Sequence, residues 1–141
     1  PVFVTTSTTT DFPDLAKRSG GEEAIANVFA VSALKAPFGT AAVKKESDIF
    51  TRSFPNEPTM SFSLMGMSGA YAVVEGLKRA GPNLTRESYL KALETLNGTP
   101  AGPAACDIKF SATQHEGCRD MTVWTSVGGK PADIGRTWRK K

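Results

Sequence analysis

The sequence predicts an α/β fold in which strands at the two ends of the chain enclose a block of helices. β-prone apolar runs stand near both ends, and apolar residues recur at helical spacing between them. Because strands and helices do not alternate, a single doubly wound sheet does not follow. A piece of a two-lobed protein fits better, with the helical block in a different lobe from the flanking strands. We expect strands at 1–6, 24–33, 107–110 and 121–124, and helices at 12–19, 41–54, 59–80 and 86–97.

The first strand and the helix after it have clear local signals. The apolar run 2–4 is continuous and β-prone, which predicts a buried strand. Asp11 can cap the short helix that follows, and Pro13 is tolerated in its first turn. Gly20 and Gly21 then end that helix.

The central helices are predicted from their caps and their apolar faces. Thr40 can cap the helix at 41–54, and Gly81 stops the longest helix, at 59–80. Thr85 can cap the last helix, and Gly98 can close it, before a Gly/Pro loop at 99–103. We expect a buried stripe on the longest helix, made of Ala70, Val73, Val74 and Leu77. Tyr89, Leu93 and Leu96 share one face of the last helix.

The composition is that of an ordinary soluble globular domain. The 141 residues are 40% hydrophobic and 22% charged, with a net charge of +3. This mild charge gives no reason to expect nucleic acid or an anionic membrane as a partner. After a turn at Gly128-Gly129, basic residues gather at the end of the chain, where a solvated tail is expected. They are Arg136, Arg139, Lys140 and Lys141.

Cys106 and Cys118 flank a polar turn that holds the single histidine, His115. If the two flanking segments are neighbours, a disulfide is possible; the alternative is two reduced thiols. The three residues match no common zinc module and lack a fourth ligand, so no metal is expected. An enzyme built on His115 and Cys118 would need an orienting acid that the sequence does not specify. No phosphate-binding glycine loop is present, and no cofactor is expected.

Two segments are candidates for a ligand site. The hydroxyl-rich run 5–10 follows the first strand, and ligands of open α/β sheets bind beyond the carboxyl ends of strands. Its hydroxyls can hold a small ligand, or they can bond within their own loop. Phe62 starts the longest helix together with Met60, Met65 and Met67. These residues form either core or the soft apolar wall of a pocket.

Three motifs together resemble one family. They are Leu77-Lys78-Arg79-Ala80-Gly81, Leu84-Thr85-Arg86-Glu87, and Ile108 to Thr113 followed by His115 and Gly117. In this order they resemble the carboxy-terminal portion of the type I periplasmic binding proteins, the Leu/Ile/Val-binding family of ABC importers. The resemblance implies two Rossmann-like lobes joined by crossing segments. By this resemblance, 1–33 is part of lobe 2, 34–119 is part of lobe 1, and 120–141 is the final crossover and end of lobe 2.

The resemblance also implies a ligand site between the lobes. It carries over Thr6, Ser7, Thr8 and Phe62 as ligand-binding residues, and places Met67 where the family often has a tyrosine. In amino-acid-binding members an acid in the first loop pairs with the ligand ammonium, and Ser7 stands at that position. Since serine carries no charge, the ligand need not be an amino acid. We expect a small carboxylate-bearing molecule, which is an amino acid or an aromatic or other organic acid.

The function implied is solute binding without chemistry. The ligand is captured by domain closure and delivered to the permease of an ABC importer, in the periplasm or, lipid-anchored, outside a Gram-positive cell. The alternative is a ligand-sensing receptor domain of the same fold. Because the chain begins Pro-Val-Phe-Val inside an expected strand, we also expect further residues upstream. The partners are then a small-molecule ligand, the permease, and either this upstream portion or an exchanged dimer.

Overall fold

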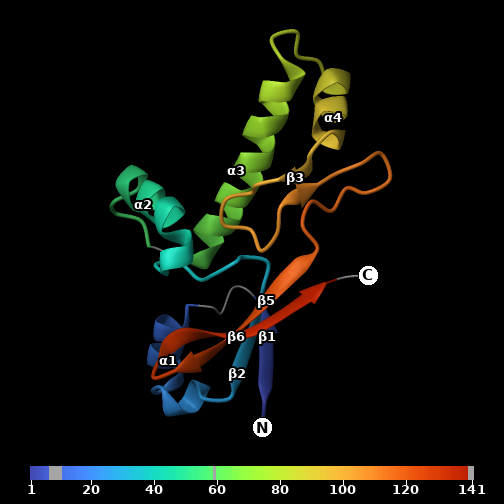
Figure 1. Cartoon of the computed structure of the whole chain (residues 1–141). Helices are drawn as coiled ribbons and strands as arrows, with labels where there is room; N and C mark the ends of the chain where they lie inside the picture. The colour runs from blue at the N-terminus through green and yellow to red at the C-terminus, as the bar shows by residue number, and fades with distance from the viewer. Residues whose placement is uncertain (7–10, 59, 140–141) are drawn as a thin grey trace.

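The computed structural model describes residues 1–6, 11–58 and 60–139 and shows the expected mixture of strands and helices. The α/β fold class is therefore confirmed (Figure 1). The elements in chain order are β1 (Phe3–Thr6), α1 (Phe12–Ser19), η2 (Glu23–Ile25), β2 (Val28–Ser32), η3 (Ala41–Val43), α2 (Lys44–Ser53), α3 (Ser61–Ala80), α4 (Arg86–Glu94), β3 (Asn97–Thr99), β4 (Ile108–Lys109), β5 (Asp120–Val127) and β6 (Lys130–Arg139).

One sheet joins the two ends of the chain. Its strand order is β1-β2-β5-β6, with β1 parallel to β2 and the other neighbours antiparallel. Ala30 lies opposite Trp124 in the register, and both side chains are buried. We call these four strands with α1 and η2 the sheet part, and the remaining elements the helical part. Figure 1 shows the helical part above the sheet part, with α3 and α4 side by side.

The described residues form two apolar cores, and the larger one joins the two parts. The larger core combines Phe12 of α1 and Trp124 of β5 with Leu64 at the start of α3. It therefore runs from the sheet into the helical part. The smaller core lies between α4 and the β3–β4 pair, around Leu96 and Ile108. Leu96 is fully buried, while Tyr89 and Leu93 are partly buried on the same side of α4.

Local chemistry sets several helix ends as predicted. The Thr85 hydroxyl accepts from Ser88 N, and the Ser88 hydroxyl accepts from Thr85 N, which completes a capping box at the start of α4. Gly20 ends α1 in the left-handed region, with φ of 93°. Gly81 ends α3, as expected.

Two predicted caps are wrong. Asp11 precedes α1, but its side chain makes no capping bond to that helix, because the carboxylate bonds to Ser61 instead. Thr40 likewise does not cap with its side chain, since its hydroxyl donates to Pro37 O at 2.8 Å. The segment predicted as one helix from Ala41 therefore begins with a 3₁₀ turn, and α2 starts at Lys44.

The predicted burial of two apolar segments is also wrong. Val2, Phe3 and Val4 are 67%, 56% and 70% exposed, because β1 is an edge strand. On α3, Val73, Val74 and Leu77 are 48%, 49% and 41% exposed, and Ala70 is exposed as well. The helix packs on α4 through another face, where Gly76 meets Leu93. Periodicity identified an apolar stripe correctly, but nothing in the described chain covers it.

Three boundaries differ from the predictions because backbone pairing overrides local signals. The strand expected at 24–33 is limited to β2, since η2 takes up its first residues. Gly98 does not close α4; Thr95 is the C-cap, and Gly98 lies in β3, which also includes Thr99 from the expected loop. The expected basic tail is β6 as far as Arg139, paired with β5 through the Gly128-Gly129 turn. Lys140 and Lys141 lie outside the described residues.

Candidate functional site

The first predicted ligand-binding segment begins at the carboxyl end of β1. Thr6 is the last residue of that strand and pairs with Val31 of β2. Ser7 and Thr8 lie outside the described residues, as does the side chain of Thr6. The description resumes at Asp11, directly before α1. β1 therefore ends, at Thr6, on the side of the sheet where ligands of open α/β proteins bind.

The second predicted segment is the amino-terminal turn of α3. Phe62 is the second residue of this helix, and its side chain is 53% exposed. Ser61, beside it, is completely buried. An aromatic ring left half-exposed next to a buried polar residue is available to contact a ligand. Met65 and Met67 are different, because both pack against the larger core.

Hydrogen bonds connect the two segments across 50 residues of sequence. Asp11 Oδ2 accepts from Ser61 N, and Asp11 Oδ1 accepts from the Ser61 hydroxyl, each at 3.2 Å. The Ser61 hydroxyl also accepts from Phe38 N at 3.5 Å. The residue that follows the hydroxyl-rich loop is therefore bound to the residue that precedes Phe62. Sequence reasoning missed this role of Asp11, because Asp11 stands at an ordinary position for capping its own helix.

Chain segments that cross between the two parts lie next to one another. Leu34 and Ala104 form an antiparallel bridge, with Lys35 N donating to Pro103 O at 2.9 Å and Ala105 N donating to Ala33 O at 2.8 Å. These contacts lock the segment that leaves β2 against the segment that precedes β4. The chain then returns to the sheet part at the start of β5.

The structure joins Cys106 and Cys118 by a disulfide beside this junction. Since both sulfur atoms are used in the bond, neither is a zinc ligand or a nucleophile. His115 is exposed in the loop between them. Among the described residues, no group of three or more His, Cys, Asp and Glu side chains could hold a metal ion.

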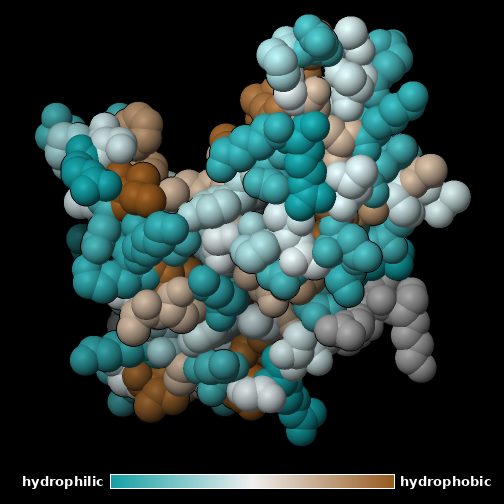
Figure 2. All heavy atoms as spheres, turned by 45° about the horizontal axis from the view of Figure 1, so that its top comes forward, coloured by the Kyte–Doolittle hydropathy of each residue, from teal (hydrophilic) through white to brown (hydrophobic). Residues whose placement is uncertain are grey.

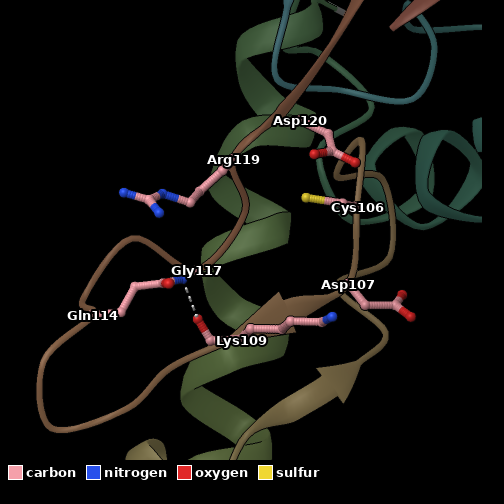
Figure 3. A pocket seen from close by; sticks show the side chains of 7 residues that line it. All are labelled: Cys106, Asp107, Lys109, Gln114, Gly117, Arg119 and Asp120. Carbon is pink, nitrogen blue, oxygen red and sulfur yellow. Dashed lines mark hydrogen bonds between the residues drawn. The ribbon is translucent and has the colours of Figure 1, made fainter. Parts of the chain in front are cut away.

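A cavity of about 390 Å³ lies beside Cys106, one end of the disulfide, and charged side chains are among those that line it. Its charged side chains do not converge: Figure 3 shows Arg119 pointing to one side and Lys109 and Asp107 to the other. Gln114 closes the wall by donating from Nε2 to Lys109 O at 3.2 Å. Because Arg119 is also paired with Glu116 at 2.8 Å, the cavity offers no focused charge for a ligand.

A larger, more apolar hollow of about 620 Å³ lies along α3. Met67, Ala70 and Val74 line it from α3, and Ile49 lines it from α2. Figure 2 shows apolar side chains at the surface of the upper part of the molecule, where α3 and α4 lie. This hollow includes part of the stripe that was expected to be buried. It is an uncovered helix face rather than an enclosed ligand pocket.

No described helix has the length and apolar character needed to cross a membrane.

Three solved structures share the architecture of this chain. A branched-chain amino acid ABC transporter protein from Thermus thermophilus, crystallised with bound valine, superposes with a TM-score of 0.70 at 20% identity; the match covers 91% of this chain and 37% of that one. A putative branched-chain amino acid ABC transporter protein from Rhodospirillum rubrum gives 0.71 at 20% identity, over 94% and 37%. A leucine-binding protein from Thermotoga maritima gives 0.65 at 14% identity, over 96% and 37%.

These structures establish the type I periplasmic binding protein fold, and this chain spans 37% of the length of each. No curated protein sequence matches the chain. A family model described as periplasmic binding protein matches residues 2–130, which is most of the sequence. The chain thus belongs to the periplasmic binding protein family.

Proposed function

We propose that this chain is the carboxy-terminal part of an extracytoplasmic solute-binding protein of a branched-chain-amino-acid-type ABC importer. The protein captures a small carboxylate-bearing ligand between two lobes and delivers it to the membrane permease. The observation that carries the proposal is the family match over residues 2–130, together with the Asp11–Ser61 contact that joins the two candidate ligand segments. Family membership also supports a periplasmic location, where an oxidising environment permits the Cys106–Cys118 disulfide.

The proposed lobes correspond to the two parts of the structure. Residues 1–33 and 120–141 belong to lobe 2, and residues 34–119 belong to lobe 1. This division is supported by the sheet, in which β1 and β2 pair with β5 and β6. It is also supported by η3, α2, α3 and α4, which fall between the two strand pairs in the sequence. The crossing at Leu34 is then a hinge about which the lobes close.

The ligand is proposed to lie between the end of β1 and the start of α3. Hydroxyl groups of Thr6, Ser7 and Thr8 would hold polar atoms of the ligand, and Phe62 would form an apolar wall. Ser7 cannot neutralise an ammonium group as a carboxylate would. Aromatic and aliphatic organic acids are therefore proposed as ligands beside amino acids.

Binding is proposed to work by domain closure without any bond being made or broken. A ligand that contacts both lobes binds the closed form more tightly than the open form, and so shifts the population toward closure. The closed form then docks on the permease. The family and the three solved structures are transport binding proteins, which supports a role other than catalysis.

Exposed apolar side chains on α3 and β1 suggest surfaces that another part of the protein covers. Val73 and Val74 on α3, and Phe3 on β1, are about half exposed or more. We propose that the upstream portion of the same protein, or failing that an exchanged dimer, covers these faces. Intact mass of this 141-residue chain under native conditions tests the idea. A stable 15.0 kDa monomer would contradict it, and a dimer or a complex with the co-expressed upstream portion would support it.

A ligand screen on the full-length protein tests the proposed function. The panel is L-valine, L-leucine, benzoate and 4-hydroxybenzoate, measured by isothermal titration calorimetry. At least one compound should bind, and Phe62→Ala should weaken that binding. Absence of binding across a wider carboxylate panel would argue against solute capture. Binding without stimulation of the ATPase of a reconstituted permease would favour the alternative, a ligand-sensing receptor domain.

A further inference from the structure

Asp11 forms the amino-terminal cap of a helix that is distant in sequence. The first N–H groups of any α-helix lack partners within the helix. At α3 the N-cap residue is Met60, whose side chain makes no capping bond. Asp11 takes its place from the sheet part, because its carboxylate accepts from Ser61 N and from the Ser61 hydroxyl.

The electrostatics of this contact are favourable. A carboxylate at a helix amino terminus interacts well with the helix dipole, and α3 has 20 residues. Hydrogen bonds to a charged acceptor are stronger than neutral ones. Ser61 is completely buried, so water competes little for its two donors. At the same time α1 receives no side-chain cap from Asp11. The Asp11 carboxylate thus caps the distant helix α3 and leaves α1, the helix that follows it in sequence, without a side-chain cap.

The contact also fixes a third segment at the junction. Phe38 N donates to the Ser61 hydroxyl at 3.5 Å, so the segment that leaves β2 is bound to the same serine. Leu64, one turn further along α3, lies in the larger core with Phe12, the neighbour of Asp11. The polar contact and the apolar core thus act on the same junction between the sheet part and the start of α3.

We infer that the Asp11–Ser61 pair is a latch that holds the two lobes in the arrangement seen here and positions Phe62 at the ligand site. This inference rests on the proposed function, because it takes the sheet part and the helical part to be lobes that move. When the lobes separate, Asp11 leaves α3 and the helix loses its cap. When they close, the cap forms and the turn that carries Phe62 is fixed. Asp11 and Ser61 are positioning residues and need not touch the ligand.

Spin-label distances in the full-length protein test the latch. Lys17→Cys on α1 and Lys91→Cys on α4 are both exposed sites. The two native cysteines of this chain are bridged, so within residues 1–141 only the new thiols react. The distance distribution is recorded without ligand and with L-valine, L-leucine, benzoate or 4-hydroxybenzoate at high concentration. In Asp11→Ala the ratio of closed to open molecules should fall about tenfold, the effect of losing two hydrogen bonds to a partly buried charged acceptor.

Matched variants separate the latch from a general loss of charge or stability. Asp14→Ala removes an exposed carboxylate from α1, the helix that follows Asp11. Asp14 forms a surface ion pair with Arg18, and its loss should leave the distribution unchanged. Ser61→Ala should act in the same direction as Asp11→Ala, and the double variant should add little. Dissociation of any panel compound that binds should accelerate in Asp11→Ala.

The outcomes are decisive for the latch and distinguish it from the proposed function. The latch is overturned if Asp11→Ala and Asp14→Ala give the same distribution, or if the wild type never populates the separation found in this structure. If no compound binds but Asp11→Ala still opens the protein, the latch stands and the solute-binding proposal fails. If a compound binds and Asp11→Ala changes neither distances nor dissociation, the latch fails and the solute-binding proposal stands.

Discussion

Thr122 donates its hydroxyl hydrogen to Leu34 O at 2.6 Å, although the two residues are 88 positions apart. The same hydroxyl oxygen accepts from Trp124 Nε1 at 2.8 Å. One side chain on β5 therefore satisfies both the carbonyl at the crossing segment and the indole N–H in the core. Loss of the Thr122 hydroxyl should therefore destabilise the region where the chain passes between the two parts.

Thr122→Val in the full-length protein should lower the free energy of unfolding by about 1–3 kcal/mol, because the buried indole N–H loses its acceptor. Urea unfolding followed by fluorescence measures the change. Thr137→Val is the control, since Thr137 lies opposite Thr122 on β6 and is exposed. Equal effects of the two substitutions would show that the hydroxyl network is unimportant.

Gly76→Ala should destabilise the protein by about 1–3 kcal/mol through overpacking between α3 and α4. A methyl group at this position would come within 2.7 Å of Leu93 Cδ2 and 2.9 Å of Tyr89 Cε2. Gly69→Ala on the same helix meets nothing within 4 Å and should stabilise by up to about 1 kcal/mol, because alanine favours helix. Thermal unfolding of both variants checks the opposite signs. A stabilised Gly76→Ala would mean that the two helices are not packed as closely as described.

Breaking the disulfide should lower the free energy of unfolding by about 3 kcal/mol, because the intact bridge restricts the unfolded chain by closing a loop. The Cys106→Ser, Cys118→Ser double variant should unfold at a lower urea concentration than the oxidised wild type, and reductant should move only the wild type. Urea midpoints with and without dithiothreitol make the comparison. A wild type that is insensitive to reductant would indicate that the bridge is absent in solution.

Phe62→Ala and Leu64→Ala should separate ligand binding from stability. Leu64 is fully buried, so its truncation should lower the free energy of unfolding by about 2–5 kcal/mol. Phe62 is 53% exposed, so its truncation should change stability by less than about 1 kcal/mol while weakening ligand binding. Calorimetric titration and urea unfolding of each variant provide the two readouts. A Phe62→Ala variant with unchanged affinity would remove Phe62 from the ligand site.

Sequence reasoning succeeded where the controlling chemistry is local. Thr85 was expected to cap the last helix, and its hydroxyl does so by accepting from Ser88 N, three residues along. Gly20 likewise ends a helix through its own backbone freedom. Cys106 and Cys118 flank one turn, so a bridge between them could be foreseen as one of two possibilities. The fold class followed from the order of strands and helices.

Sequence reasoning failed where a distant partner decides the outcome. Asp11 has the right position to cap α1, but Ser61 offers it two buried donors from another element. Arg136 and Arg139 were expected to lie in a solvated tail, yet pairing with β5 places both in the strand β6. The stripe on α3 has the correct period, but a period carries no information on whether a covering surface is present. Within the candidate site, Phe62 was predicted and the role of Asp11 was not.

The pairing of β2 with β5 also governs the order of folding. Ser32 and Thr122 meet across 90 positions of chain, so the sheet part closes a long loop before it gains these contacts. The α3–α4 hairpin depends on contacts between neighbours in sequence and can form much earlier. During synthesis, β1 and β2 therefore leave the ribosome well before their antiparallel partner does. In that interval the apolar residues of β1 and β2 are open to wrong pairing.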